Sequence, residues 1–335
     1  MKKFDLPYIS LEITSDCNLN CRYCYNTWKR PGEKTVRLNS YLKAKKVLKQ
    51  LFRIADIKHV TFTGGEPFLS ERFDEIVLFT RMKKKDVTLI TNGNAASQKD
   101  YEMMVKLGVG LFELPLHSIN PEIHDKITKV NSSWEKSLQS IKILINNGAQ
   151  VVGVIVITKI NFNDVPETMK FMKSIGIRNI MLNRYNYGGS GIAEADHICM
   201  THQEIKDTYK KANEIAVDTE LSVTSNVCTP FCLLNPEEYP NIGFGSCSRD
   251  VKTMPLTVDI NGNLRLCNHS PVIAGNIFEN DFETIFKSDY VANWNIETPL
   301  FCKDCNIYEK CLGGCRAAAE QLGHGNAAVD PIMTI

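Results

Sequence analysis

The stretch Cys17-Asn18-Leu19-Asn20-Cys21-Arg22-Tyr23-Cys24 places three thiols within eight residues. It follows directly on Tyr8–Thr14, whose alternating residues indicate a β-strand. Thiolates are soft metal ligands, and this spacing lets one loop bring three sulfurs to one centre. Three is one fewer than a tetrahedral zinc or a closed cubane needs, so a zinc knuckle with a distant fourth ligand, or three unrelated cysteines, are the alternatives at this point.

The composition limits the classes of function. The 335 residues carry a net charge of +1, with 39 Lys and Arg against 38 Asp and Glu, which argues against a nucleic-acid partner. No run approaches the roughly 18 apolar residues of a membrane span, and the first residues lack the apolar core of a signal peptide. We therefore expect a cytoplasmic protein with no membrane partner, in which the 12 cysteines stay reduced.

Apolar runs alternate with amphipathic segments from about residue 8 to residue 183. Such alternation predicts right-handed βαβ units and a parallel sheet. Six strands are too few for a closed eight-stranded barrel, so we predict an α/β fold, a partial (β/α)6 TIM-like barrel, with the cysteine loop at the C-terminal end of its first strand. The predicted strands are Ile9–Thr14, His59–Thr63, Val87–Thr91, Gly110–Leu116, Val151–Thr158 and Asn179–Asn183, and the predicted helices are Leu42–Ala55, Phe73–Lys84, Asp100–Leu107, Ser132–Asn146, Val165–Ser174 and Gln203–Val217.

The second predicted strand ends in Thr63-Gly64-Gly65-Glu66-Pro67. Its glycines permit close backbone approach, and Glu66 offers a carboxylate to an ammonium group. Alone, this is equally a structural strand-to-helix turn. Together with the cysteine loop at the end of the preceding strand, it resembles the radical S-adenosylmethionine (AdoMet) superfamily.

That resemblance implies a [4Fe-4S] cluster on the three loop cysteines, with one iron left free to bind AdoMet. It also implies reductive cleavage of AdoMet to a 5'-deoxyadenosyl radical, which abstracts a substrate hydrogen. Gly64, Gly65 and Glu66 would hold the amino group of AdoMet. Further AdoMet contacts implied by the resemblance are Tyr23 at the adenine, Asn92 (whose alternative is turn chemistry), Ser118 at the ribose and Arg184 after the sixth strand, while His117 is either a core or a substrate-facing residue.

A second group of cysteines lies far along the chain, because only Cys199 and later cysteines follow Cys24, after a gap of about 175 residues. Cys247-x14-Gly262-x4-Cys267 encloses an expected β-hairpin, Leu256–Ile260 and Asn263–Leu266, joined by a type I′ Asn261-Gly262 turn. Cys302-x2-Cys305-x5-Cys311-x3-Cys315 follows. On spacing alone, these last four cysteines are also suited to a zinc ribbon.

Read together, these spacings resemble the SPASM extension of radical AdoMet enzymes, which holds up to two auxiliary [4Fe-4S] clusters. The resemblance assigns Cys247, Cys267 and Cys315 to the first auxiliary cluster, and Cys302, Cys305 and Cys311 to the second. A seventh cysteine is missing, and Asp330-Pro331-Ile332-Met333 stands where relatives often have DPxC. The second cluster then has an oxygen ligand such as Asp330, an open iron, or a smaller or missing cluster.

Two further cysteines lie just upstream, in Cys228-Thr229-Pro230-Phe231-Cys232. Either thiol is a candidate catalytic hydrogen-atom donor, a ligand that completes an auxiliary cluster, or a packed side chain. Cys199 is expected to be packed and inert. We expect three regions: the barrel at 1–195, a linking region at 196–245, and the SPASM extension at 246–335.

The resemblance implies an enzyme, and SPASM enzymes most often modify ribosomally made peptides by crosslinking, epimerisation, decarboxylation or residue oxidation. We expect a peptide substrate here. One alternative is a radical dehydrogenase or rearrangement enzyme acting on a small molecule in cofactor or natural-product biosynthesis. Another is a redox-inert adaptor with structural zinc at the C-terminal cysteines.

The partners follow from the same resemblance. Only about eight residues precede the first predicted strand, which leaves no room for an N-terminal peptide-recognition domain. We therefore expect a separate recognition protein, or capture of a leader peptide at a strand edge or groove. A flavodoxin or ferredoxin is expected to supply the electron.

Overall fold

The computed structural model describes residues 3–29, 41–325 and 328–334. Its strands are β1 (Phe4–Asp5), β2 (Tyr8–Thr14), β3 (Ala55–Asp56), β4 (His59–Gly64), β5 (Asp86–Ile90), β6 (Leu111–Pro115), β7 (Gln150–Ile157), β8 (Asn179–Arg184), β9 (Ser222–Ser225), β10 (Ile242–Phe244), β11 (Thr257–Asp259), β12 (Asn263–Arg265) and β13 (Gly275–Asn276). Its α-helices are α1 (Tyr41–Ile54), α2 (Phe73–Met82), α3 (Gln98–Lys106), α4 (Pro121–Thr128), α5 (Ser133–Asn146), α6 (Val165–Ser174), α7 (Ala195–Ile198), α8 (His202–Thr219), α9 (Phe282–Phe286), α10 (Asp289–Ile296), α11 (Tyr308–Cys311) and α12 (Arg316–Gln321).

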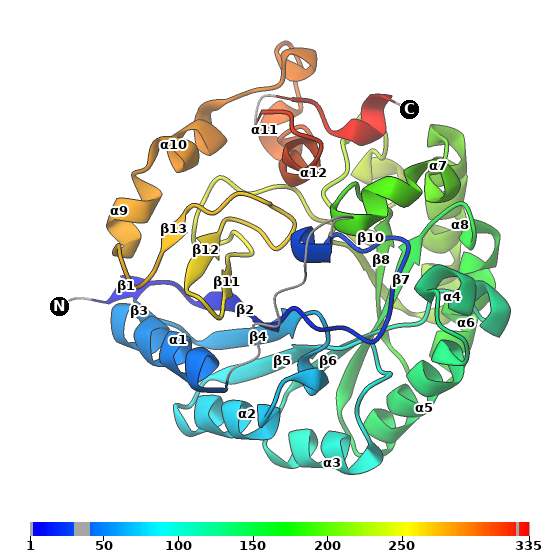
Figure 1. Cartoon of the computed structure of the whole chain (residues 1–335). Helices are drawn as coiled ribbons and strands as arrows, with labels where there is room; N and C mark the ends of the chain where they lie inside the picture. The colour runs from blue at the N-terminus through cyan, green and yellow to red at the C-terminus, as the bar shows by residue number, and fades with distance from the viewer. Residues whose placement is uncertain (1–2, 30–40, 326–327, 335) are drawn as a thin grey trace.

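One curved sheet organises the molecule. Within the described residues it has eleven strands in the order β10-β9-β8-β7-β6-β5-β4-β2-β11-β12-β13, and neighbouring strands are parallel from β10 to β11. The six predicted strands are β2, β4, β5, β6, β7 and β8, adjacent and in the predicted order, with the helices of the βα units on the outer face (Figure 1). The partial barrel is confirmed, and three further parallel strands extend it, β9 and β10 at one edge and β11 at the other.

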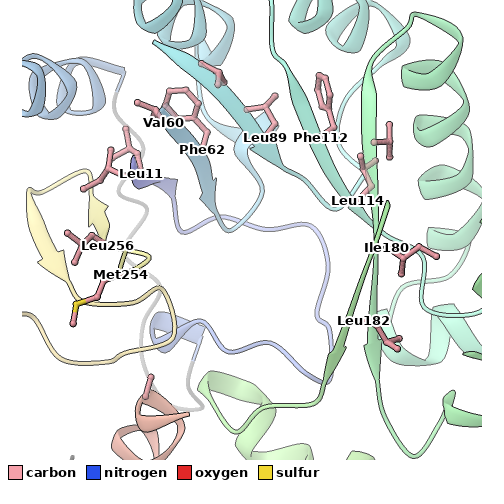
Figure 2. Packing of buried hydrophobic residues seen from close by; sticks show 14 of the residues in the cluster. Leu11, Val60, Phe62, Leu89, Phe112, Leu114, Ile180, Leu182, Met254 and Leu256 are labelled. Carbon is pink, nitrogen blue, oxygen red and sulfur yellow. The ribbon is translucent and has the colours of Figure 1, made fainter. Parts of the chain in front are cut away.

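The main core lies between the sheet and the surrounding helices. On β7, every second residue is buried, and a Cβ at Gly153 would lie 2.7 Å from Met172 Sδ of α6, so this face of the strand packs against the helix. Because side chains alternate across a strand, Val152, Val154 and Val156 face the concave side. Figure 2 shows the packed side chains of successive strands, among them Phe62 and Leu182, with Met254 and Leu256 in the yellow segment across from them.

The predicted hairpin exists as β11 and β12, but its turn is not of type I′. The strands pair antiparallel, with Val258 opposite Leu264. Gly262 N donates to Asp259 O at 3.0 Å, and Gly262 has a φ of +86°. A type I′ turn needs positive φ at both central residues, whereas Asn261 is absent from the described residues with positive φ. The connection is a β-turn closed by a left-handed glycine.

The strand β11 joins the C-terminal region to the barrel, because it pairs in parallel with β2. The sheet therefore contains strands from both sides of the predicted boundary at residue 246. In the part of the chain that the structure describes, no helix is both long and apolar enough to cross a membrane.

Candidate active site and auxiliary cysteine groups

The cysteine loop begins where β2 ends and is seated on the turn after β4. Gly65 N donates to Thr14 O and Glu66 N donates to Asp16 O, both at 2.7 Å. These two bonds fix the chain immediately before Cys17. The first cysteine is therefore positioned by the Gly-Gly-Glu turn that follows the neighbouring strand.

The far end of the loop is fixed in the same manner. Asn26 Nδ2 donates to Gly64 O at 2.9 Å. Gly191 N, in the glycine-rich segment after β8, donates to Cys24 O at 2.9 Å. The loop thus crosses the C-terminal ends of the strands, with contacts to β4 and to the glycine-rich segment after β8 (Figure 1).

Both glycines of the turn are required by close packing. A Cβ at Gly64 would lie 2.4 Å from Thr14 O, and one at Gly65 would lie 2.0 Å from Asp16 O. Gly64 also has a φ of +127°, which favours glycine. In the structure these glycines admit the backbone of the cysteine loop, and their contact with AdoMet stays a prediction.

Glu66 is a buried carboxylate that joins two strand ends. It accepts hydrogen bonds from Thr91 Oγ1 at 2.8 Å, Asn92 N at 2.7 Å and Phe68 N at 3.2 Å. Burial raises its pKa to about 7, although these three donors act in the opposite direction. Its contact with the ammonium group of AdoMet stays a prediction, whereas its bonds to the end of β5 are established by the structure.

Asn92 lies against the first cysteine. Its Nδ2 is 3.6 Å from Cys17 Sγ and donates to Asn18 Oδ1 at 2.8 Å. Its Oδ1 accepts from Asn94 N at 2.8 Å, so the residue also makes the turn that was the alternative interpretation. One amide side chain thus shapes the turn after β5 and contacts the cysteine loop.

Tyr23 lies among the three loop cysteines. Burial, followed by the charges of Cys21, Cys24 and Cys17 as thiolates, raises its pKa well above the usual value. The Tyr23 phenol is therefore within electrostatic range of all three loop cysteines. Its hydroxyl is 2.8 Å from His117 Nε2.

His117 supports Tyr23 from the strand layer. Its Nδ1 accepts from Val156 N at 3.2 Å, which places the ring proton on Nε2, directed at the Tyr23 oxygen. Burial lowers the pKa of His117, so the ring is neutral. Of the two interpretations left open by the sequence, the structure favours the core residue.

Ser118 is hydrogen-bonded within the protein. Its hydroxyl donates to Asp164 Oδ2 at 2.5 Å and accepts from Asn120 N at 2.8 Å, and the residue is fully buried. Its one proton is used by Asp164, and the contact with the ribose of AdoMet stays a prediction. Ser118 instead joins the end of β6 to the start of α6.

Arg184 is also placed in the core, contrary to the prediction of an AdoMet contact. Its side chain is 1% exposed and donates to Asp330 Oδ2 at 2.5 Å, across a gap of 146 residues. Further bonds reach Thr229 Oγ1, Cys228 O, Tyr185 O and Asn186 Oδ1. These contacts use all five N–H donors of the guanidinium, which leaves no donor for a ligand.

Four cysteines form the first auxiliary cysteine group: Cys228, Cys247, Cys267 and Cys315. A side-chain hydrogen bond to Cys247 is the largest cause of the raised pKa of Cys228, followed by burial and then by Cys315 and Cys267. Asn186 Nδ2 donates to Cys315 Sγ at 3.1 Å. Cys247, Cys267 and Cys315 thus all lie within electrostatic range of Cys228, and their assignment to one cluster stays a prediction.

The other four form the second auxiliary cysteine group: Cys232, Cys302, Cys305 and Cys311. Burial, followed by Cys311, Cys232 and Cys305, raises the pKa of Cys302 to about 11. All four line one cavity of about 60 Å³, which is several times the roughly 10–15 Å³ that one water needs. The cavity therefore has room for a multi-atom group.

The donor atoms of these sites fit iron–sulfur clusters. Within residues 3–29, 41–325 and 328–334, no three Cys, His, Asp or Glu side chains surround a point suited to one metal ion. A single zinc ion draws its thiolates to about 2.3 Å, whereas a cubane distributes its ligands over separate irons and accepts a wider spacing. The donors of these sites are cysteine thiolates, the ligands that hold iron–sulfur clusters.

Residues that sequence reasoning missed connect the cysteine loop to the first auxiliary group. Tyr25 stacks on His269 with ring centroids 3.9 Å apart, and His269 N donates to Cys267 Sγ at 3.3 Å. Gln321 Nε2 donates to His269 O at 2.8 Å and to Tyr25 O at 3.2 Å. No local pattern indicates the contacts of Tyr25, because His269 and Gln321 lie more than 200 residues away from it along the chain.

The sequence is similar to one protein family and to several named proteins. The sequence model of the Radical SAM superfamily matches residues 11–172. The "antilisterial bacteriocin subtilosin biosynthesis protein AlbA" of Bacillus subtilis is 25% identical, over 93% of this chain and 68% of its own length. The "PqqA peptide cyclase" of Gluconobacter oxydans is 22% identical, over 98% of this chain and 91% of its own length.

Solved structures share the fold at low identity. The structure of anSMEcpe with bound AdoMet has a TM-score of 0.75 at 16% identity, covering 98% of this chain and 91% of that one. Streptococcus suis SuiB bound to its precursor peptide SuiA has a TM-score of 0.73 at 15% identity, covering 98% of this chain and 76% of that one.

Proposed function

The chain belongs to the radical SAM superfamily of enzymes, which use AdoMet and a [4Fe-4S] cluster, and on this premise we propose that it modifies a ribosomally made peptide. The observation that carries the proposal is the similarity, along nearly the whole chain, to proteins whose names specify peptides. AlbA is named for subtilosin biosynthesis, the second relative for cyclising the PqqA peptide, and SuiB was solved with a precursor peptide.

The residues divide among three cluster sites in this proposal. Cys17, Cys21 and Cys24 hold the catalytic cluster, which together with AdoMet supplies the radical that abstracts a hydrogen atom. The first and second auxiliary cysteine groups hold one cluster each, and these accept or relay an electron or anchor the substrate. The boundaries 1–195, 196–245 and 246–335 are retained as functional regions.

The concave side of the sheet offers the substrate an apolar surface. Val152, Val154 and Val156 face this side, opposite the helix-packed residues of β7. Leu114 of β6 packs outward, near Gly93, so Glu113 faces inward by alternation. Apolar walls exclude water from a reactive substrate. The half-buried carboxylate of Glu113 can orient the backbone or an ammonium group of that substrate.

The chain's own residues position the reacting groups. Glu66 and Asn92 hold the end of β5 against the loop, and neutral His117 holds the Tyr23 hydroxyl by a hydrogen bond from Nε2–H. These hydrogen bonds fix the end of β5 and the Tyr23 ring relative to the cysteine loop, and groups held in this way need little reorganisation during reaction. The work of the protein is to place a substrate C–H bond beside the cleavage site of AdoMet.

Partners and location follow from the proposed chemistry. A flavodoxin or ferredoxin supplies the electron, and a separate recognition protein or an exposed strand edge captures the leader segment of the peptide. The thiols require a reducing compartment, so we place the protein in the cytoplasm.

The test is anaerobic turnover with short peptides encoded beside the gene of this protein. Reconstituted enzyme, AdoMet and dithionite are incubated with each peptide, and the products are read by mass spectrometry. We expect 5'-deoxyadenosine formation to rise with one such peptide, together with a covalent change in it. The Cys17→Ala variant serves as the matched control and should give neither signal.

Two other results would replace the proposal. Turnover of a small molecule, with every such peptide left unchanged, would favour a radical dehydrogenase or rearrangement enzyme. Zinc without acid-labile sulfide, and no cleavage of AdoMet, would indicate a structural adaptor.

A further inference from the structure

The second auxiliary cysteine group has only three cysteines within its own stretch of sequence. Cys302 ends the 3-10 helix Leu300–Cys302, Cys305 lies in the following turn, and Cys311 ends α11. Three thiolates leave one iron of a cubane without a protein ligand. Whether the chain supplies a fourth ligand depends on what else faces the same cavity.

Asp330 is not available for this position. Its Oδ2 accepts from Arg184 Nη2 at 2.5 Å and from Cys315 N at 2.7 Å, and its Oδ1 accepts from Ile332 N at 3.0 Å. The carboxylate is 0% exposed and is absent from the lining of the cavity. The oxygen ligand considered from the sequence is thus bound into the core.

Cys232 does face the cavity, from a segment some seventy residues earlier in the chain. The turn that carries it is closed by Leu233 N and Leu234 N, which donate to Pro230 O at 2.9 and 3.0 Å. Phe231 N, directly before Cys232, donates to Cys311 Sγ at 3.2 Å. A backbone amide beside Cys232 therefore already contacts one sulfur of the group.

The base of this turn is anchored independently. Arg184 donates to Thr229 Oγ1 at 2.9 Å and to Cys228 O at 3.0 Å. On the opposite side, a Cβ at Gly314 would lie 2.7 Å from the Pro230 ring, so the turn packs closely on the segment between Cys311 and Cys315. A rigidly held turn can present a ligand without a large loss of conformational entropy.

We propose that Cys232 is the fourth ligand of an iron–sulfur cluster bound by Cys302, Cys305 and Cys311. The turn Cys228–Cys232 then reaches both auxiliary cysteine groups, with Cys228 beside the first and Cys232 in the second. The inference concerns cluster assembly alone and does not depend on the peptide substrate.

Met333 lines the same cavity and provides a sharp test. Its thioether is a weaker ligand for iron–sulfur clusters than a thiolate, and the substitution Met333→Cys places a thiol at a second wall of the cavity. If Cys232 acts as a ligand, Met333→Cys should compensate for the loss of Cys232. If Cys232 has only a structural role, Met333→Cys should not restore the iron that Cys232→Ala loses.

The experiment compares anaerobically reconstituted wild type, Cys232→Ala, Cys232→Ala/Met333→Cys and Cys199→Ala. Cys199 is the control, because its thiol is 3.1 Å from Tyr187 Oη and belongs to neither auxiliary group. The readouts are iron and acid-labile sulfide per chain, and electron paramagnetic resonance. We expect Cys232→Ala to lose about four irons, or about one iron with a new three-iron signal, and the double variant to regain them.

Three results would overturn the inference. Iron, sulfide and spectra in Cys232→Ala that equal those of the wild type and of Cys199→Ala would show that Cys232 is not a ligand. A loss in Cys232→Ala without recovery in the double variant would assign Cys232 a structural role. A zinc ion in the wild type that disappears in Cys232→Ala would mean that the four thiols hold a single metal. AdoMet cleavage by the Cys17–Cys24 site, measured in each variant, shows that the barrel is folded.

Discussion

Gly65 has no room for a side chain, since a Cβ would lie 2.0 Å from Asp16 O. Gly65→Ala should therefore push the chain before Cys17 out of position. We expect reconstituted Gly65→Ala to lose about four irons and its AdoMet cleavage. Gly110→Ala is the control, because its Cβ would meet Val87 O at an ordinary 3.9 Å. Equal iron contents in the two variants would contradict this role of Gly65.

Glu113 makes the stability of the protein depend on pH. Burial raises its pKa from 4.5 to about 7, so between these values the folded state binds more protons than the unfolded state, and stability falls as pH rises. In Glu113→Gln this contribution, at most about 3 kcal/mol, is absent. Thermal unfolding of the holoenzyme from pH 5 to pH 8 should show a shallower decline than in wild type. The substitution Glu135→Gln, at an exposed residue, should keep the wild-type dependence of stability on pH. The same dependence in Glu113→Gln would contradict this role of Glu113.

The site residues differ in how far the sequence could reveal them. The three loop cysteines, the Gly-Gly-Glu turn and Asn92 are recognisable because each follows a predicted strand, and parallel strands bring their ends together. Arg184 also follows such a strand, yet its partner Asp330 lies 146 residues away and draws it into the core. Cys232 gave no signal for a particular cluster, since its neighbours are set by the folding of the C-terminal region.

At the scale of elements, the turn between β11 and β12 positions the strand that precedes Cys267. Gly262 has a φ of +86°, and a Cβ there would lie 2.6 Å from the Phe278 ring. Gly262→Ala should lower the free energy of unfolding by about 1–2 kcal/mol from backbone strain, and by more if the ring cannot move. Gly148→Ala is the control for backbone strain alone, because Gly148 has a φ of +76° and a Cβ there would have no atom within 4 Å. Thermal unfolding that is less affected by Gly262→Ala than by Gly148→Ala would be inconsistent with the packing.

The predicted strands and helices were those with strong periodicity, and their boundaries match to within a few residues. The strand β9 was missed because Ser222–Ser225 is short, polar and exposed at alternate residues. The helix α4 was missed although Asn120 caps it and Pro121 begins it, a recognisable signal. The parallel pairing of β11 with β2 joins segments about 250 residues apart, which no local pattern can predict.

At the scale of the whole molecule, the C-terminal region completes the sheet of the barrel. Removing it would expose the edge of β2 and uncover Leu11, which packs in one core with Leu256 and Val258. A chain ending at residue 245 is therefore expected to aggregate, or to fail to bind the catalytic cluster. Size-exclusion chromatography and iron content after reconstitution measure this. A monomeric truncated chain with about four irons would show that residues 246–335 are an independent domain.

The most direct measurement compares wild type with a Cys17/Cys21/Cys24→Ala triple variant after anaerobic reconstitution. Iron, acid-labile sulfide and 5'-deoxyadenosine are determined after addition of AdoMet and dithionite. The account predicts about twelve irons in wild type, about four fewer in the variant, and 5'-deoxyadenosine only in wild type. Zinc without sulfide in wild type, or 5'-deoxyadenosine formation that survives in the variant, would contradict it.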